Sequence, residues 1–264
     1  MREAFANEAL WKEFQTGIWD TIYSTVAATL VACVLGIILG IILVAGEEDG
    51  VRPLPGPVMK VLNFAINILR SVPFLILMIM VLPLSELLVG TTIGTVASIP
   101  PLIIASASFV ARLVETSLRE VDKGVIEAAQ SMGCSPFQII WKVILPESLP
   151  SLVASFTTAF ITILGYGAMA GAIGGGGLGK IAINYGYYKY NYAVMLIAVV
   201  FIVVLVHIYS GRSRKDDRTG TERAVKDHRR TAVLRDYFIG HRQRGRISSH
   251  HSVPLYHAEA EATI

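Results

Sequence analysis

The sequence predicts an all-α, polytopic membrane protein with five transmembrane helices. Of its 264 residues, 53% are hydrophobic and only 16% are charged, whereas a soluble domain carries about 25% charged residues. Four uncharged stretches, each of 22 residues or more, occupy residues 21–46, 87–111, 148–179 and 190–211. About 20 apolar residues cross a bilayer core. Because a backbone in lipid must satisfy its own hydrogen bonds and no barrel-strand alternation is present, we expect helices.

A fifth span is less regular, because Arg70 interrupts it. The apolar run after Arg70 is short for a span alone, so we predict one helix with an embedded arginine and a kink near Pro73. The predicted spans are about 17–46, 58–84, 87–111, 148–172 and 190–209. We expect 1–16 to be an external N-terminal segment without a signal peptide and 210–264 to be a basic, disordered cytoplasmic tail.

The distribution of Lys and Arg predicts the orientation. An odd number of spans places the two ends of the chain on opposite sides. If the N-terminus is outside, the inner segments and the tail hold 18 Lys and Arg against 4 in the outer segments, and 6 against 4 without the tail. Positive residues favour the cytoplasmic side. We therefore predict an external N-terminus and a cytoplasmic C-terminus.

Several classes of site find no support in the sequence. The two cysteines, Cys33 and Cys134, are too far apart and too isolated for a disulfide framework or a zinc site. The glycines of 174–179 match a dinucleotide fingerprint, but a long apolar run precedes them instead of a strand, and Ile181 stands where a P-loop needs Ser or Thr. We interpret this stretch as an outer turn that either packs helices closely or acts as a gate.

Residues 112–147 form the longest polar stretch within the membrane part. We expect Arg112 and Glu115 to pair on a helix that leaves the third span. Asp122 is a suitable cap for a short helix to about Met132, and Gly133 suits a left-handed turn. Ser135, followed by Pro136, is a suitable cap for a second short helix that ends before Pro146. The apolar faces of this protrusion could dock on a partner: Val125, Ile126, Met132, Phe137 and Ile140.

One pattern in this loop resembles a known family. Glu127-Ala128-Ala129, Gly133 after three residues, and Val143-x-Leu145-Pro146 after nine more resemble the EAA motif of ABC-importer permeases. Those permeases usually have Ile where Val143 stands. The resemblance implies a type I ABC importer permease fold. It also implies a cytoplasmic coupling helix that binds a separate ATPase subunit, with the contacts at Glu127, Ala128, Ala129, Gly133, Leu145 and Pro146.

Four other segments are similar to the permeases of methionine importers, namely 70–74, 89–94, 165–179 and 185–187. This resemblance implies a bacterial inner-membrane subunit that moves methionine and is itself no enzyme. ATP and Mg would be held by two copies of the ATPase, and this chain would hold no cofactor. A homodimer is expected because five helices are too few to enclose a pathway. An external binding protein or lipoprotein would deliver substrate, and membrane lipid, not nucleic acid, would surround the chain.

The candidate pathway or gate residues are Arg70, Pro73, Tyr166, Met169, Gly174 and Gly176. An arginine inside a membrane is costly and by default suggests function. Two placements of Arg70 stay open: embedded near mid-depth, or interfacial because 58–69 lies along the membrane surface, which we favour. Met169 either faces a thioether substrate or fills the core, and we favour the core.

Two other functions remain as alternatives. The chain could be an ABC permease for another amino acid or small solute. A secondary transporter, from a different class, would need acidic or polar ion sites within the membrane. Because Asp20 and Glu86 lie only at span ends, that class is disfavoured, and a channel would leave the EAA loop unexplained.

Overall fold

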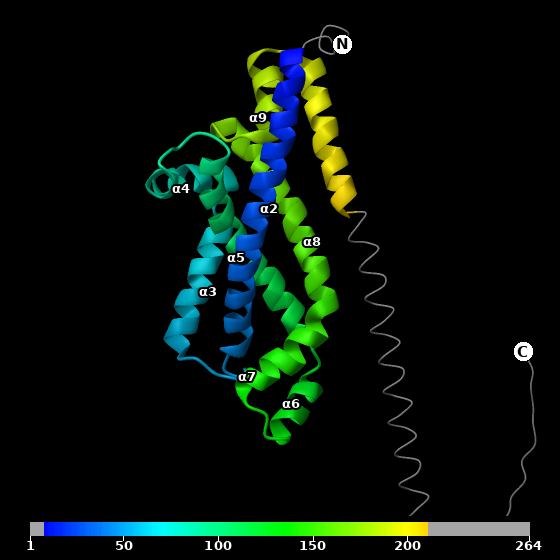
Figure 1. The fold of residues 1–264 in the computed structure, drawn as a ribbon. Helices are drawn as coiled ribbons and strands as arrows, with labels where there is room; N and C mark the ends of the chain where they lie inside the picture. Colours follow the sequence, from blue (N-terminus) through cyan, green and yellow to red (C-terminus); the bar gives the residue numbers. More distant parts are fainter. Residues whose placement is uncertain (1–7, 211–264) are drawn as a thin grey trace, which may run out of the picture. The chain divides into compact units, whose positions relative to one another are not determined.

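The computed structural model describes residues 8–210, and these residues form a helical bundle without strands (Figure 1). The tail predicted at 210–264 therefore lies, except for Ser210, outside the described residues, as do residues 1–7. The α-helices are α2 (Glu8–Ala45), α3 (Gly56–Ser71), α4 (Phe74–Val89), α5 (Ile99–Arg119), α6 (Lys123–Ser131), α7 (Pro136–Ile139), α8 (Leu145–Ala170), α9 (Gly177–Ile183) and a last helix, Tyr192–Ser210. Short 3-10 segments lie at Val96–Ser98 and Gly171–Ile173, and π-helical segments at Ile140–Ile144 and Asn184–Tyr188.

Helices α2 and α5 pack closely along a seam of two glycines. A Cβ on Gly36 would lie 2.5 Å from Cγ1 of Val110, and a Cβ on Gly40 would lie 2.5 Å from Cγ1 of Val114. Gly36 and Gly40 are four residues apart and therefore lie on one face of α2. Small residues at this spacing let two helix backbones approach in a membrane, where packing drives association.

Helix α2 begins at Glu8, nine residues before the predicted start. Leu10 and Phe14 are 7% and 2% exposed and pack against Leu178 of α9 and Val194 of the last helix. Lys12 and Glu13 lie between these two apolar residues, so the sequence showed no uninterrupted apolar run here. The helix of the first predicted span therefore includes residues 8–16, which the sequence analysis assigned to the external N-terminal segment.

A hydrogen bond joins the same end of α2 to the Asn184–Tyr188 segment. The Tyr185 hydroxyl donates to Oε2 of Glu13 over 2.8 Å. This hydrogen bond raises the pKa of the Tyr185 phenol above its usual value, since it favours the protonated form. The contact ties two segments that lie 172 residues apart in the sequence.

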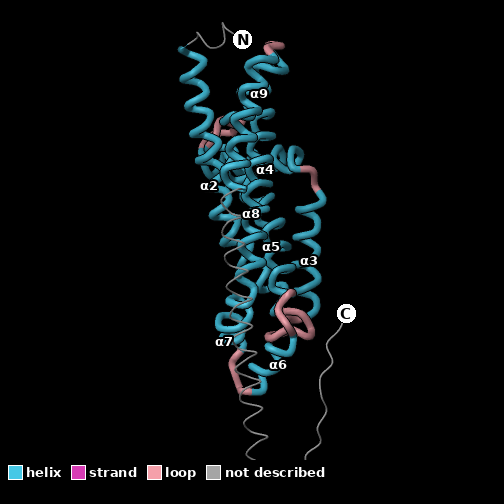
Figure 2. The backbone as a smooth tube through the Cα atoms, turned by 90° about the vertical axis from the view of Figure 1, so that its right-hand side faces the viewer, coloured by secondary structure: helices cyan, strands magenta, loops and turns pink. Residues whose placement is uncertain are grey.

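The predicted single helix over 58–84 is two helices, α3 and α4, which meet at an angle of 111°. Pro73 cannot donate a hydrogen bond, and Val72 before it is extended, with φ −76° and ψ 126°. Helix α3 runs beside α5, whereas α4 lies across the bundle (Figures 1 and 2). This arrangement favours an embedded Arg70 over the surface placement of 58–69, because α3 follows the direction of the bundle.

Helix α5 starts later than predicted, and it continues beyond the third span, as predicted, and ends at Arg119. Residues 87–89 end α4, and Gly90 follows them in a left-handed conformation, with φ 79°. Pro101 lies in the first turn of α5, where a missing N–H costs nothing because first-turn N–H groups have no helical partner. Pro100 and Pro101 therefore lie at the start of α5 and do not kink it.

Helix α7 does not end before Pro146, as the sequence suggested, but continues into α8. The π-helical turn Ile140–Ile144 joins them, and the N–H of Leu145 donates to the carbonyl of Ile140. This wider turn passes the chain into α8 with Pro146 in its first turn, where a residue without an N–H is tolerated. The continuous helix spans Pro136–Ile173.

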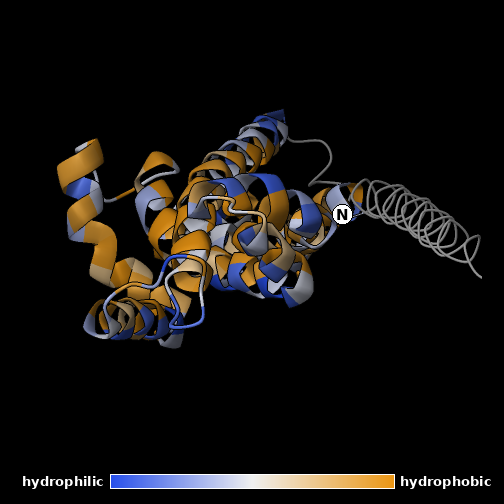
Figure 3. Ribbon diagram, turned by 90° about the horizontal axis from the view of Figure 1, so that it is seen from below, coloured by the Kyte–Doolittle hydropathy of each residue, from blue (hydrophilic) through white to orange (hydrophobic). Residues whose placement is uncertain are grey.

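Four of the described helices are long and apolar enough to cross a membrane, or up to five if the bent pair α3–α4 forms one span. This agrees with the predicted number of five. Apolar residues cover most of the helices (Figure 3), and large ones such as Leu30 and Leu87 are 64% and 81% exposed. Exposed apolar surface on this scale suits a bundle that is solvated by lipid or by other apolar helices.

Candidate coupling and pathway sites

Helices α6 and α7 form a protrusion at one end of the bundle, opposite the end that carries α9 (Figures 1 and 2). The Asp122 carboxylate accepts a 2.6 Å hydrogen bond from the N–H of Gly124 and caps α6. Gly133 adopts φ 78°. Ser135 and Gln138 form a reciprocal capping box at the start of α7, with Pro136 as its first residue. The predicted caps and the predicted left-handed glycine are confirmed.

The EAA residues divide between the inner and outer faces of α6. Ala129 is 3% exposed and packs in the main core cluster, together with Ile139 and Ile144. Glu127 and Ala128 are exposed. The helix is therefore anchored through Ala129 and presents Glu127 and Ala128 outward.

Exposed apolar side chains surround this outer face. Val125, Met132 and Phe137 are 42%, 76% and 68% exposed, and Trp141, which the sequence analysis missed, is 57% exposed. The rings of Phe137 and Trp141 lie 5.9 Å apart. Their spacing of four residues was the signal that could have placed Trp141 on the same face. Ile126 and Ile140, by contrast, are partly buried against the core.

Leu145 and Pro146 lie away from α6, in the first turn of α8. Leu145 is partly buried and packs against the same core cluster as Ala129. Pro146 is exposed. The two halves of the EAA motif therefore lie on different helices, α6 and α8, and both pack against the same core cluster.

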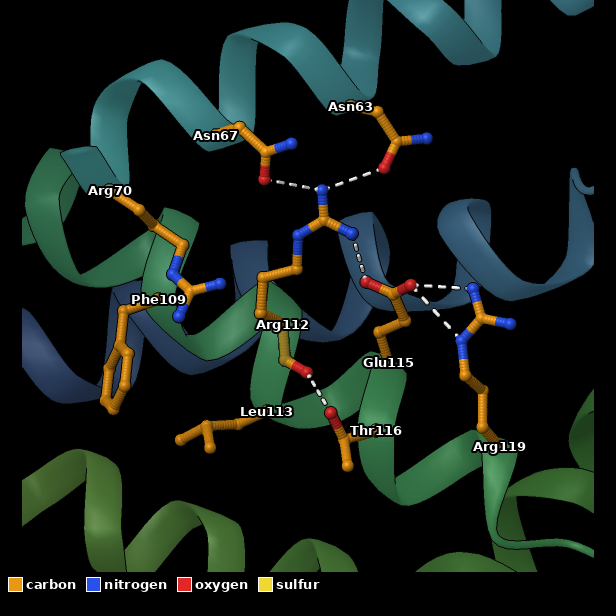
Figure 4. A pocket seen from close by; sticks show the side chains of 9 residues that line it. All are labelled: Asn63, Asn67, Arg70, Phe109, Arg112, Leu113, Glu115, Thr116 and Arg119. Carbon is orange, nitrogen blue, oxygen red and sulfur yellow. Dashed lines mark hydrogen bonds and ion pairs between the residues drawn. The ribbon is translucent and has the colours of Figure 1, made fainter.

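A polar network that the sequence did not predict connects α3 to α5 (Figure 4). Arg112 donates to Oε2 of Glu115 over 2.6 Å, as the sequence predicted, and also to Oδ1 of Asn63 and Oδ1 of Asn67 over 2.8 and 2.9 Å. Arg119 pairs with Glu115 over 2.7 Å. Arg119 also forms a bidentate ion pair with Glu47, which lies two residues after the end of α2.

Three cavities follow one another along α3. The first, of about 440 Å³, lies at the start of α3 beside Glu47 and shares Asn63 and Asn67 with a second one, of about 480 Å³. The second contains the Arg112 network and shares Arg70 and Phe109 with a third, of about 260 Å³. Their shared lining residues place the three cavities in order along α3, from its start to the break between α3 and α4.

Two of the predicted pathway residues, Arg70 and Tyr166, line the third cavity, and Pro73 lies at the break beside it. The Tyr166 ring stacks on Phe74, with ring centroids 4.5 Å apart and planes inclined by 5°. This pair connects α8 to the start of α4. The structure therefore gathers half of the predicted pathway residues at one place.

The other predicted pathway residues lie elsewhere. Met169 is 49% exposed and lines none of the three cavities. Gly174 has φ 90°, and its carbonyl accepts a 2.8 Å hydrogen bond from the N–H of Gly94. A Cβ on Gly176 would lie 1.8 Å from Oγ1 of Thr95. The glycine-rich turn therefore packs tightly against the α4–α5 connection, as one of the two sequence interpretations expected.

The polar face of α3 was readable in the sequence but was missed. Lys60, Asn63, Asn67 and Arg70 recur every three or four residues, which places them on one face of a helix. The segment 58–84 is mostly apolar, and it was therefore interpreted only as a membrane span. Among residues 8–210, no cluster of three or more His, Cys, Asp or Glu side chains could hold a metal ion.

Residues 34–212 match the family of binding-protein-dependent transport system inner membrane components, and the chain belongs to this family. It is 52% identical to the probable D-methionine transport system permease protein MetI of Vibrio cholerae over 152 residues, which are 58% of this chain and 68% of that protein. It is also 52% identical to the methionine import system permease protein MetP of Bacillus subtilis over 151 residues, 57% of this chain and 68% of that one.

A solved structure has the same fold. A chain of the MetNI methionine ABC transporter in an inward-facing conformation superposes with a TM-score of 0.78 at 38% sequence identity. The match covers 81% of this chain and 98% of that chain. The predicted type I ABC importer permease fold is therefore confirmed.

Proposed function

We propose that this chain is the permease subunit of an ATP-driven importer that moves methionine across the inner membrane. The relatives that it resembles over most of their length are methionine permeases, and the solved transporter with the same fold carries methionine. The observation that supports this most directly is the capped, outward-facing α6 with Glu127 and Ala128 exposed beside apolar side chains. Such a surface suits a partner subunit.

The proposed assembly contains two copies of this chain, two ATPase subunits and an external binding protein or lipoprotein. Each ATPase subunit would receive one α6, and it would hold the ATP and Mg, while this chain would hold no cofactor. Movement of the ATPase pair would reach the bundle through the Ala129 core contact and through Leu145 and Pro146 at the start of α8. The small side chain of Ala128 permits close approach of the two subunits, and that of Ala129 permits close packing of α6 on the core.

We infer that α6 and α7 face the cytoplasm and that the N-terminus lies outside. The charge distribution supports this orientation, and so does the position of α6 and α7 at the end of the bundle opposite α9 (Figure 1). Arg70, Pro73 and Tyr166 would line the pathway within the bundle. Gly174 and Gly176 would pack the outer turn closely against the α4–α5 connection.

The test is assembly and transport with a defined set of partners. The chain, co-expressed with the methionine-importer ATPase of its own genome, is expected to co-purify with it and to give ATP-dependent methionine uptake in proteoliposomes with the binding protein. Gly133→Asp is expected to abolish both, because aspartate adds a side chain and a negative charge to the exposed docking surface. Intact pairing and transport in this variant would disprove the coupling role.

A permease for another amino acid is the second candidate. The polar network and Arg70 would suit any amino acid carboxylate, whereas the apolar wall of the third cavity favours an apolar side chain. Competition of labelled methionine uptake by the two methionine isomers and by leucine, histidine and glutamine separates the two candidates. Stronger competition by another amino acid than by either methionine isomer would reject the methionine assignment.

A further inference from the structure

Arg70 contributes a positive charge that no carboxylate among residues 8–210 pairs with. Three guanidinium groups, those of Arg70, Arg112 and Arg119, line the second cavity. The two carboxylates of the network, Glu115 and Glu47, are already engaged by Arg112 and Arg119. The cavity therefore holds one positive charge more than its partners neutralise, and an unpaired charge within a membrane helix is costly.

Arg112, which lines the same cavity as Arg70, is held in place by hydrogen bonds. Asn63 and Asn67 accept hydrogen bonds from Nη2 of Arg112, and Glu115 accepts one from Nη1. Its Nε is buried and has no hydrogen-bond acceptor. Figure 4 shows the Arg70 and Arg112 side chains reaching into the same space from α3 and α5. The two side chains thus offer one guanidinium held by hydrogen bonds and one without a carboxylate partner, and this group best matches an oxyanion such as a carboxylate.

An apolar cavity adjoins this positive site directly. Arg70 and Phe109 also line the third cavity, whose other walls are Leu69, Val72, Phe74, Leu77, Ala105 and Tyr166. Its volume of about 260 Å³ is just below the usual range of ligand pockets. The stacked Phe74 and Tyr166 rings form part of its wall. A ligand that carries an oxyanion and a short apolar side chain would satisfy both cavities at once.

We propose that Arg70 binds the carboxylate of the transported amino acid, with Arg112 as the second positive group, while the Phe74–Tyr166 cavity receives its apolar side chain. This inference rests on the proposed function. The phosphate of an anionic lipid has the same charge chemistry, but the small third cavity suits one short side chain better than two acyl chains. The path of cavities along α3 gives the bound amino acid a route toward the end of the bundle that carries α6.

The experiment uses the permease–ATPase complex in nanodiscs of phosphatidylcholine alone, with a diazirine analogue of methionine as the probe. Cross-links mapped by mass spectrometry are expected in 69–77 and at Tyr166. Arg70→Gln is expected to lower their yield about tenfold or more, since hydrogen bonds to charged groups contribute ~1.5–3 kcal/mol. Arg70→Lys is expected to be intermediate. Methionine should compete, and methionine amide, which lacks the carboxylate, should not.

Arg52→Gln is the matched control, because Arg52 is an exposed arginine in the α2–α3 connection that lines none of the three cavities. It should label like the wild type. Co-purification with the ATPase and an unchanged melting temperature verify that Arg70→Gln is folded. If Arg70→Gln does not fold, the cross-link yield of Arg70→Lys is compared with that of the wild type instead.

Two results would overturn the proposal: equal labelling of wild type and Arg70→Gln, or Arg70-dependent retention of phosphatidylglycerol with no labelling by the methionine probe. In either case, ATP-driven methionine uptake by the wild type would leave the proposed function standing. If the wild type itself showed no such uptake, the proposed function would fail.

Discussion

Gly133 sets the direction of the chain between α6 and α7. Its φ of 78° lies in the left-handed region, and its N–H donates a 2.9 Å hydrogen bond to the carbonyl of Gln130. A Cβ at this position would meet no atom within 4 Å. The cost of a substitution is therefore conformational and not steric.

This distinction makes a prediction about two uncharged substitutions. Gly133→Val should strain the turn by about 1–2 kcal/mol, whereas Gly133→Asn should cost less, because Asn visits left-handed conformations more readily. Co-purification with the ATPase and methionine uptake are expected to fall for the valine variant and to stay near wild type for the asparagine variant. Equal losses in both variants would show that side-chain size, and not backbone conformation, matters here.

Gly40 gives a contrasting case, in which the cost is steric. A Cβ there would lie 2.5 Å from Val114 on α5, whereas a Cβ on Gly165 of α8 would meet no atom within 4 Å. We expect Gly40→Ala to lower the free energy of unfolding by about 1–3 kcal/mol and Gly165→Ala to be neutral or slightly stabilising. Thermal melting in detergent measures both. Similar melting temperatures for the two variants would contradict the close α2–α5 contact.

At the scale of helices, the caps and turns set by nearby residues could be predicted from the sequence, whereas contacts between distant residues could not. Asp122, Gly133 and Ser135 act on residues within three positions of themselves, and each was found in its predicted role. The 111° angle between α3 and α4 could not be predicted from Pro73 alone, since the stack of Phe74 on Tyr166 brings together residues that lie far apart in the sequence.

The same limit explains the other differences. The start of α2 depends on contacts of Leu10 and Phe14 with α9 and the last helix. The polar network joins Arg112 to Asn63 across 49 positions, and only the spacing of the α3 residues hinted at it. Individual candidates such as Arg70 and Tyr166 were identified, but their shared cavity depends on four helices, α3, α4, α5 and α8, whose arrangement no local pattern encodes.

The Phe74–Tyr166 stack makes a prediction about how the bent pair is held. An aromatic pair contributes about 0.5–1.5 kcal/mol beyond its area burial, so Tyr166→Ala should destabilise the fold and reduce methionine uptake. Tyr166→Phe keeps the ring and should retain both. Melting temperature and uptake rate are the measurements. A phenylalanine variant as impaired as the alanine variant would assign the role to the hydroxyl group instead of the stacked ring.

For the whole molecule, the proposed orientation predicts which residues an impermeant reagent reaches. In a background with Cys33→Ser and Cys134→Ser, Lys12→Cys should react with a membrane-impermeant maleimide in intact cells. Asp49→Cys, in the connection between α2 and α3, should react only after permeabilisation, because the Lys and Arg distribution places it inside. The reverse labelling pattern would show that the orientation in the membrane is the opposite one, with α6 and α7 outside.

We propose that this family member imports methionine by using a separate ATPase that binds α6. The most direct measurement is uptake of labelled methionine into proteoliposomes that contain this chain and its ATPase, with binding protein outside and ATP inside. We expect accumulation that requires ATP and is lost with Gly133→Asp. Uptake that proceeds without ATP, is driven by an ion gradient, or is unaffected by Gly133→Asp would contradict it.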